Sequence, residues 1–145
     1  MKKQRIYVCL VIILLLIVDQ HSKYLFYNQE IWISLPFIDP FLNTGISWGI
    51  PMPQLLITSI SLFCIILFGV LYFKKLFTFR EVSLFMAGTM GNLLDRRIFW
   101  GVRDFIAIGN FPIFNVADAF LTIAVALFCI KELLLLQKRK KTLSS

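Results

Sequence analysis

The sequence predicts an all-α membrane protein built from four transmembrane helices. Of its 145 residues, 59% are hydrophobic, and the mean hydropathy is +0.81. A water-soluble domain of this length could not bury that much apolar surface, because its exposed area is large relative to its core. The apolar residues fall into four long runs, and Lys and Arg gather in alternate connections between them. We therefore expect a multi-pass protein of a bacterial inner (cytoplasmic) membrane.

The four runs have the length of membrane spans, which need about 20 residues. The run at 55–73 contains no charged residue, and the run at 81–99 contains Gly88 and Gly91, which allow helices to approach closely. The first run follows basic residues, as a secretory signal peptide does, but no small-residue cleavage site follows it, so we expect it to be retained. The predicted spans are about residues 6–24, 55–73, 81–99 and 116–136.

Orientation follows from the basic residues in short connections, which stay on the cytoplasmic side. The N-terminal segment, residues 74–80 and residues 138–145 are basic, whereas the connection over residues 26–53 has no Lys or Arg. We therefore expect both termini in the cytoplasm and the first and third connections toward the periplasm. Residues 1–137 are expected to form one integral-membrane domain, and residues 138–145 a disordered basic cytoplasmic tail.

The first outer connection carries a pattern typical of short strands. Apolar residues occupy every second position from Ile31 to Phe37. Pro36 and Pro40 do not fit a central strand, so edge strands or an irregular hairpin are expected. The tripeptide at 43–45, Asn-Thr-Gly, predicts a turn.

Several function classes are disfavoured by the residue inventory. The net charge of +7 comes from residues at helix ends, so nucleic-acid binding is not expected. The three cysteines form no metal-binding pattern, and no metal is expected. His21 is the only histidine, which excludes the H-E-x-x-H zinc peptidases, and no nucleophile-elbow motif is present. For a hydrolase, a pair of carboxylates that activates water remains.

Four of the eight acidic residues collect at the predicted outer end of the bundle. They are Asp19, Asp95, Asp104 and Asp118. Ionisable groups at membrane depth are costly, which makes each a candidate for function. Structural interpretations also exist. Asp19 lies four residues before Lys23, as in a helical ion pair, and Asp118 lies in a first helical turn, where the dipole favours an anion.

The third connection breaks the charge rule, because it faces outward and yet contains Arg96, Arg97 and Arg103. These arginines are expected to pair with nearby carboxylates. In a purely structural interpretation, Asp95 would pair with Arg96 and Arg97, and Asp104 would be solvated. Arg103 would alternatively stabilise the ionised form of Asp104.

Two asparagines accompany the carboxylates. Asn92 precedes Asp95 and Arg96 by three and four positions, so the three share one helix face. Asn115 is positioned to cap the helix over residues 116–136, and it is equally suited to orient a substrate backbone. At the opposite end, the glutamates at 81 and 132 are expected to pair with basic neighbours.

Five segments, in the same order, resemble motifs of the lipoprotein signal peptidases (signal peptidase II), the membrane aspartic proteases that mature bacterial lipoproteins. The resemblance covers residues 19–118, and five motifs in register are specific although each is a weak string alone. The segments are residues 19–23 (DQHSK), 43–49 (NTGISWG), 88–96 (GTMGNLLDR), 102–105 (VRDF) and 114–118 (FNVAD).

The resemblance implies the site residues and the substrate. Asp104 and Asp118 would be the catalytic carboxylates. The substrate would be a prolipoprotein whose cysteine already carries diacylglyceryl, cut just before that cysteine. No cofactor is implied, and we expect a monomer in contact with membrane lipid whose active site faces the periplasm. The implied supporting or substrate-binding residues are Asp19, Lys23, Asn43, Gly91, Asn92, Asp95, Arg96, Asn115 and Ala117.

The resemblance also implies a fold, a four-helix transmembrane bundle with a small periplasmic β-sheet and a short periplasmic helix. The alternating segment near Trp32 would supply the sheet, and the stretch between Ile98 and Pro112 the helix. Two positions depart from the family pattern: Gly101 directly precedes Val102, and the residue before Asp104 is an arginine rather than an apolar residue.

Two other classes of protein stay open at this stage. A small proton-coupled transporter would also need intramembrane aspartates, although carriers bind near the midplane and these carboxylates collect at one end. A structural scaffold would tolerate substitution of all four aspartates.

Overall fold

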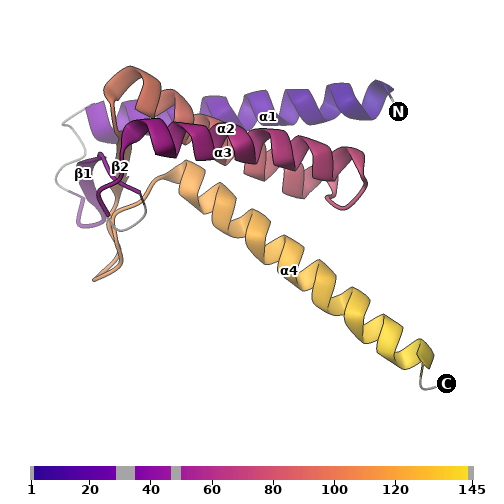
Figure 1. Cartoon of the computed structure of the whole chain (residues 1–145). Coiled ribbons are helices and arrows are strands. Elements are labelled where there is room, and N and C mark those ends of the chain that lie inside the picture. The colour runs from indigo at the N-terminus through magenta and orange to yellow at the C-terminus, as the bar shows by residue number, and fades with distance from the viewer. Residues whose placement is uncertain (1, 29–34, 47–49, 144–145) are drawn as a thin grey trace.

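The computed structural model describes residues 2–28, 35–46 and 50–143, and long helices dominate it (Figure 1). A two-stranded sheet and a short π-helical turn lie at one end. The elements are α1 (Lys2–Lys23), η1 (Tyr24–Asn28), β1 (Ile38–Asn43), α2 (Gln54–Phe73), α3 (Phe79–Phe99), β2 (Val102–Ile106) and α4 (Val116–Leu143).

Helix α3 lies between its neighbours and packs against α1, α2 and α4, and α4 starts beside the sheet and diverges toward its C-terminal end (Figure 1). Both termini lie at the end of the bundle opposite the sheet (Figure 1). We call the end with β1 and β2 the sheet end, and the end with the chain termini the terminal end. This arrangement agrees with the charge pattern, which requires both termini on one side.

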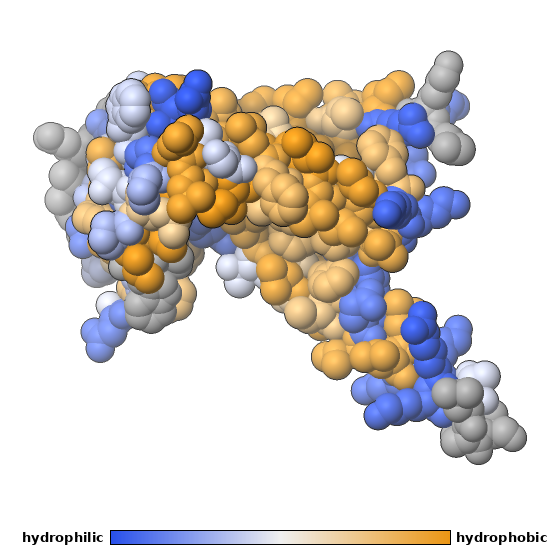
Figure 2. Space-filling view, viewed as in Figure 1, coloured by the Kyte–Doolittle hydropathy of each residue, from blue (hydrophilic) through white to orange (hydrophobic). Residues whose placement is uncertain are grey.

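Within the described ranges, three helices are long and apolar enough to cross a membrane: α1 with η1, α2 and α4. Apolar side chains cover much of the middle of the molecule (Figure 2). The predicted span at 81–99 forms helix α3, which is more polar. It packs against each of the other three helices, and its buried residues include Glu81, Ser83 and Asp95. A helix shielded by neighbours can bury polar groups on its inner faces when these are paired.

The expected short helix between Ile98 and Pro112 is wrong, because this stretch contains strand β2. Helix α3 ends where Trp100 adopts a left-handed conformation (φ 59°). Gly109 also has a positive φ (53°), and the residues between these two points are too few for a stable helix. Strand β2 instead pairs with β1 and, through Ile106, with Phe114.

The expected small sheet is present, and its first strand lies in the first outer connection. The segment near Trp32 lies mostly outside the described residues, and β1 begins at Ile38. Strands β1 and β2 are antiparallel, with Asn43 opposite Val102. A Cβ atom on Gly101 would lie 2.9 Å from Leu42 Cγ, so a larger residue just before β2 would displace the Leu42 side chain of β1.

The C-terminal basic segment was expected to be disordered, but helix α4 continues through it to Leu143. Lys, Arg and Gln are good helix formers, and positive charge near the C-terminus complements the helix dipole.

At the terminal end of the bundle, a hydrophobic cluster joins α1, α3, α4 and the α2–α3 connection. Its buried members are Val8, Phe77, Val82, Phe85 and Ala124.

Candidate active site

The first turn of α4 holds Asp118 in a fixed position. The Asn115 side-chain oxygen accepts a hydrogen bond from the Asp118 backbone N–H (3.0 Å), and Asp118 Oδ2 accepts one from the Asn115 N–H (3.2 Å). These reciprocal bonds satisfy donors that a helix start otherwise leaves free. The predicted capping role of Asn115 is therefore confirmed.

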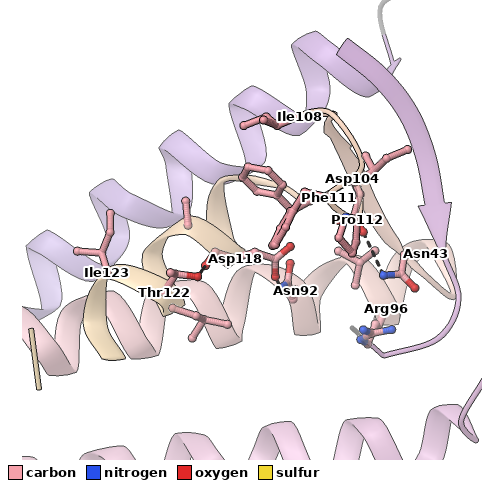
Figure 3. Close-up of a pocket in the computed structure, with 15 residues that line it drawn as sticks. Asn43, Asn92, Arg96, Asp104, Ile108, Phe111, Pro112, Asp118, Thr122 and Ile123 are labelled. Carbon is pink, nitrogen blue, oxygen red and sulfur yellow. Dashed lines mark hydrogen bonds between the residues drawn. The ribbon is translucent and has the colours of Figure 1, made fainter. Parts of the chain in front are cut away.

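Asp104 on β2 is buried, not solvated, with 1% of its surface exposed. Its Oδ1 accepts a hydrogen bond from Asn115 Nδ2 (2.5 Å), and its Oδ2 accepts one from Asn43 Nδ2 (3.1 Å). Figure 3 shows Asn43 pointing at Asp104 from the neighbouring strand. Asn115 thus binds both Asp104 and Asp118, which brings the two carboxylates to one residue.

The two aspartates line one cavity of about 710 Å³ (Figure 3). Most of its wall is apolar and comes from the segment after β2 and from α4. An apolar wall lowers the local polarity, so charges and hydrogen bonds beside it act more strongly than in bulk solvent. The polar lining residues are Asn43, Asn92, Arg96, Asp104, Asp118 and Thr122, and the apolar ones include Ile108, Phe111, Phe114, Leu121 and Ile123.

Burial raises the pKa of Asp104, and the negative charge of Asp118 raises it further, to about 7. Hydrogen bonds from Asn115 and Asn43 oppose this shift but do not cancel it. Two neighbouring carboxylates of this kind hold one proton between them near neutral pH. Such a pair can remove a proton from water with one member and donate a proton with the other.

Arg96, on the last turns of α3, also lines the cavity. Its guanidinium interacts electrostatically with Asp104 and Asp118. Within the described part of the chain, its buried Nη1 atom has no hydrogen-bond partner. A positive charge therefore lies in the wall of the cavity, next to the two carboxylates.

A buried lysine connects α1 to the carboxylate pair. Lys23 is fully buried and lies 2.9 Å from Asp19, so the predicted i, i+4 ion pair is confirmed. Lys23 Nζ also donates to Asn92 Oδ1 (3.0 Å), and Asn92 Nδ2 donates to Asp118 Oδ1 (2.8 Å). Asn92 therefore binds both Lys23 and Asp118 and fixes their side chains relative to each other.

Small residues let α1, α3 and α4 meet beside this chain of contacts. Asp19 Oδ1 accepts a hydrogen bond from the Ala117 N–H (2.9 Å). A Cβ atom on Gly91 would collide with Asp19 Oδ2, and one on Gly88 would lie 2.6 Å from the Ala117 carbonyl oxygen. The predicted close helix approach at the two glycines is confirmed.

The expected ion-pair partners of Asp95 and Arg103 are wrong. Asp95 pairs with Arg103 (2.9 Å) and lies 3.6 Å from Lys23, rather than pairing with Arg96 and Arg97. Arg103 in turn binds Asp95 and not Asp104. Successive side chains on a strand point to opposite faces, so Arg103 and Asp104 face different partners.

The structure brings all eleven predicted site residues into this cavity or the hydrogen-bond network around it. The sequence prediction missed Gln20. Its Nε2 contacts Asp19 (3.1 Å) and Asp95 (3.2 Å), and its Oε1 accepts from Arg103 (2.9 Å). Gln20 stands inside the first motif, next to Asp19, but its side chain gave no signal, because its partners lie far away in the sequence.

Comparisons with known proteins agree on one family. The family model described as signal peptidase (SPase) II matches residues 11–134. A lipoprotein signal peptidase of Bacillus subtilis (strain 168) is 32% identical over 149 residues, which cover 91% of this chain and 96% of that protein. Two solved structures, each described as a bacterial membrane enzyme studied by the in meso method, at 2.3 and 1.9 Å resolution, have TM-scores of 0.75 and 31% identity. The matches cover 88% of this chain and 87% and 92% of those chains.

Proposed function

Because the chain belongs to the signal peptidase II family and removes signal peptides from prolipoproteins, we propose that Asp104 and Asp118 are its catalytic pair. One observation carries the proposal: among the described residues, these two are the carboxylates that line the cavity, and both bind Asn115. The enzyme is then an aspartic peptidase. The alternative of a proton-coupled transporter is not supported, since the family and the named relative are peptidases.

In the proposed reaction, Asp104 starts with the shared proton, because its pKa is raised to about 7. Asp118, which accepts hydrogen bonds from Asn92 and from the Asn115 backbone, acts as the base. It takes a proton from a water molecule, whose oxygen attacks the scissile carbonyl carbon. Asp104 donates its proton to the carbonyl oxygen, which gives a tetrahedral diol. As the C–N bond breaks, Asp118 passes its proton to the leaving amine and Asp104 takes a proton back from one diol hydroxyl, so a carboxylic acid forms and the pair returns to its starting state.

We further propose that the substrate carries diacylglyceryl on its cysteine and is cut just before that residue. The support is the wall of the cavity, in which apolar side chains lie next to the two carboxylates. Ile108 and Phe111 approach from the segment after β2, and Leu121 and Ile123 from α4. Acyl chains would gain contact with these side chains while the peptide lies over the carboxylates.

The proposed topology has four spans, with α3 as the fourth, in the inner membrane. Helix α3 has 21 residues, which at about 1.5 Å per residue is close to the roughly 30 Å of a bilayer core. The termini would lie in the cytoplasm and the sheet end would face the periplasm, in agreement with the Lys and Arg distribution. We propose that the enzyme acts as a monomer surrounded by membrane lipid.

The test is substitution of each aspartate in protein purified in detergent. The assay follows cleavage of a diacylglyceryl-modified precursor peptide in the presence of EDTA and without ATP. We expect Asp104→Asn and Asp118→Asn each to lower kcat by about 1,000-fold or more, because the pair loses its base or its acid. Asp39→Asn, at an exposed acid on β1, is the matched control and should cleave normally. Full cleavage by either cavity variant would refute the pair.

A further inference from the structure

We propose that Arg103 is a positioning residue for peptide cleavage: it anchors β2 to α1 and α3 and so holds Asp104 beside Asp118. The inference rests on the proposed function, because the position of β2 matters for cleavage only if Asp104 is catalytic. Arg103 does not line the cavity. Its effect would pass through the adjacent residue on the same strand.

The main contact is a three-point bond to Asp95. The Arg103 backbone N–H (2.9 Å) and side-chain Nε (3.2 Å) both donate to Asp95 Oδ2, and Nη2 donates to Oδ1 (2.9 Å). One carboxylate on α3 therefore holds both the main chain and the side chain of the residue before Asp104. Charge-assisted, forked bonds of this kind have well-defined geometry.

The rest of the guanidinium is also engaged. Its Nη2 donates to Gln20 Oε1 (2.9 Å) on α1, and Nη1 donates to Asn28 Oδ1 (2.9 Å) in η1. The group lies 4.2 Å from the centre of the Phe99 ring, and Arg103 is 5% exposed. Each nitrogen of the side chain thus has a partner, and the contacts reach three separate elements.

The sheet needs such an anchor, because it has two strands only among the described residues. An isolated pair of strands is marginally stable. On one face of β2, Asp104 is held by Asn43 and Asn115; on the other face, Arg103 ties the same strand to the helices. A carboxylate carried on this strand can keep its place opposite α4 only if the strand itself is fixed.

The first test compares Arg103→Lys with Arg97→Lys in the detergent cleavage assay. Lysine keeps the charge but cannot make the forked bonds. We expect Arg103→Lys to lower kcat by about 10- to 100-fold, because displacements on the order of 1 Å have effects of this size, while KM changes less than about 2-fold. Arg97 is exposed on the last turns of α3 and should tolerate the same exchange.

The pH profile separates positioning from a purely structural role. The charged groups that face Asp104 are Asp118 on α4, Lys23 on α1 and Arg96 on α3. Since Arg103→Lys leaves all three in place, a change in the profile reports geometry. A looser strand exposes Asp104 and separates it from Asp118, so the alkaline limb of kcat/KM should move to lower pH by about 0.5 unit. A merely structural role would lower the thermal midpoint and leave this limb unchanged.

Asn28→Ala is the second variant. It tests the positioning role of Arg103 even if Arg103→Lys does not fold. It removes one contact to the guanidinium and leaves the bond to Asp95 intact, so we expect kcat to fall about 2- to 5-fold. Normal kcat and an unchanged pH profile in the folded variants would overturn the positioning role. If Asp104→Asn is inactive in the same assay, only the positioning role has failed; if Asp104→Asn is active, the catalytic pair has failed.

Discussion

The two ends of the helix bundle each bury a polar cluster, and the clusters differ in charge balance. At the sheet end, the four carboxylates Asp19, Asp95, Asp104 and Asp118 share one network with three cations. The cations are Lys23, Arg96 and Arg103. One negative charge is therefore in excess, and a retained proton compensates it. This agrees with the raised pKa of Asp104.

At the terminal end, one buried acid is fully matched. Glu81 accepts hydrogen bonds from Lys131 Nζ (3.0 Å) and from the Thr78 backbone, and Lys131 also donates to the Leu76 carbonyl (2.7 Å). The Lys131 ammonium lies 4.9 Å from the centre of the Phe128 ring. These contacts confirm the expected pairing of the glutamates at 81 and 132, since Lys131 also lies 3.8 Å from Glu132.

The difference shows that buried charge has two uses in one small protein. The terminal cluster lies at the start of α3 and beside the connection between α2 and α3, and its buried acid, Glu81, is paired with Lys131. In the sheet-end cluster, Asp104, whose pKa is raised to about 7, and Arg96 both line a cavity. We expect substitutions at the first cluster to change stability and those at the second to change catalysis.

Outside the two aspartates themselves, the largest effect is expected at Asn115, which joins them. Asn115→Ser keeps an N-cap side chain but cannot reach Asp104, so kcat should fall about 100-fold with little loss of stability. Asn115→Ala should lose a similar factor in kcat and also about 1 kcal/mol of stability, because the cap is gone. Cleavage rates and thermal midpoints in detergent measure both. Normal kcat in Asn115→Ser would contradict the role assigned to its amide.

A slightly smaller effect is expected from a methyl group at Gly91. Its Cβ would meet the Asp19 carboxylate, whereas a Cβ on Gly69 would lie 3.7 Å from Met86 Cε, an ordinary contact. Gly91→Ala should therefore cost about 1–3 kcal/mol of stability and lower kcat. Gly69→Ala should leave both unchanged or raise stability by up to about 1 kcal/mol. Equal stability and equal kcat in the two variants would show that the Asp19 carboxylate can move without harm to the site.

At the terminal end, Lys131→Met should reduce the free energy of unfolding by about 1–2 kcal/mol, because Glu81 loses its ion-pair partner in a buried position. The kcat of the folded enzyme should stay within about 2-fold of wild type. Thermal unfolding and cleavage assays on the same preparation separate the two quantities. A large loss of kcat at unchanged stability would mean that the two clusters are coupled along the bundle.

The smallest effect concerns pH. The folded-state pKa of Asp104 is raised from 3.8 to about 7, so between these values the folded protein binds more protons than the unfolded chain. Its stability therefore falls as the pH rises through that window. Asp104→Asn removes this contribution, and its thermal midpoint relative to wild type should rise between pH 5 and pH 8, by about 3 °C for each kcal/mol of this contribution that the wild type loses. A constant difference across this range would argue against a retained proton at Asp104.

Much of the helical structure and several site residues could be predicted from local features of the sequence. The i, i+4 spacing of Asp19 and Lys23, the Asn115 cap and the long apolar runs involve residues that are neighbours in the sequence, and their consequences are decided within a few turns of helix. The two aspartates proposed as catalytic were identified from the motifs at 102–105 and 114–118.

The partners of Arg103 and Asp95, by contrast, are decided only by how the helices and strands pack in the tertiary structure. Arg103 could have faced Asp104 or Asp95, and the pleat of β2 directed it to Asp95 and to Gln20, which lies 83 residues away in the sequence. The stretch after Trp100 became a strand because β1 was close enough to bind it. Contacts between distant segments depend on how whole elements pack, and no spacing along the chain encodes that.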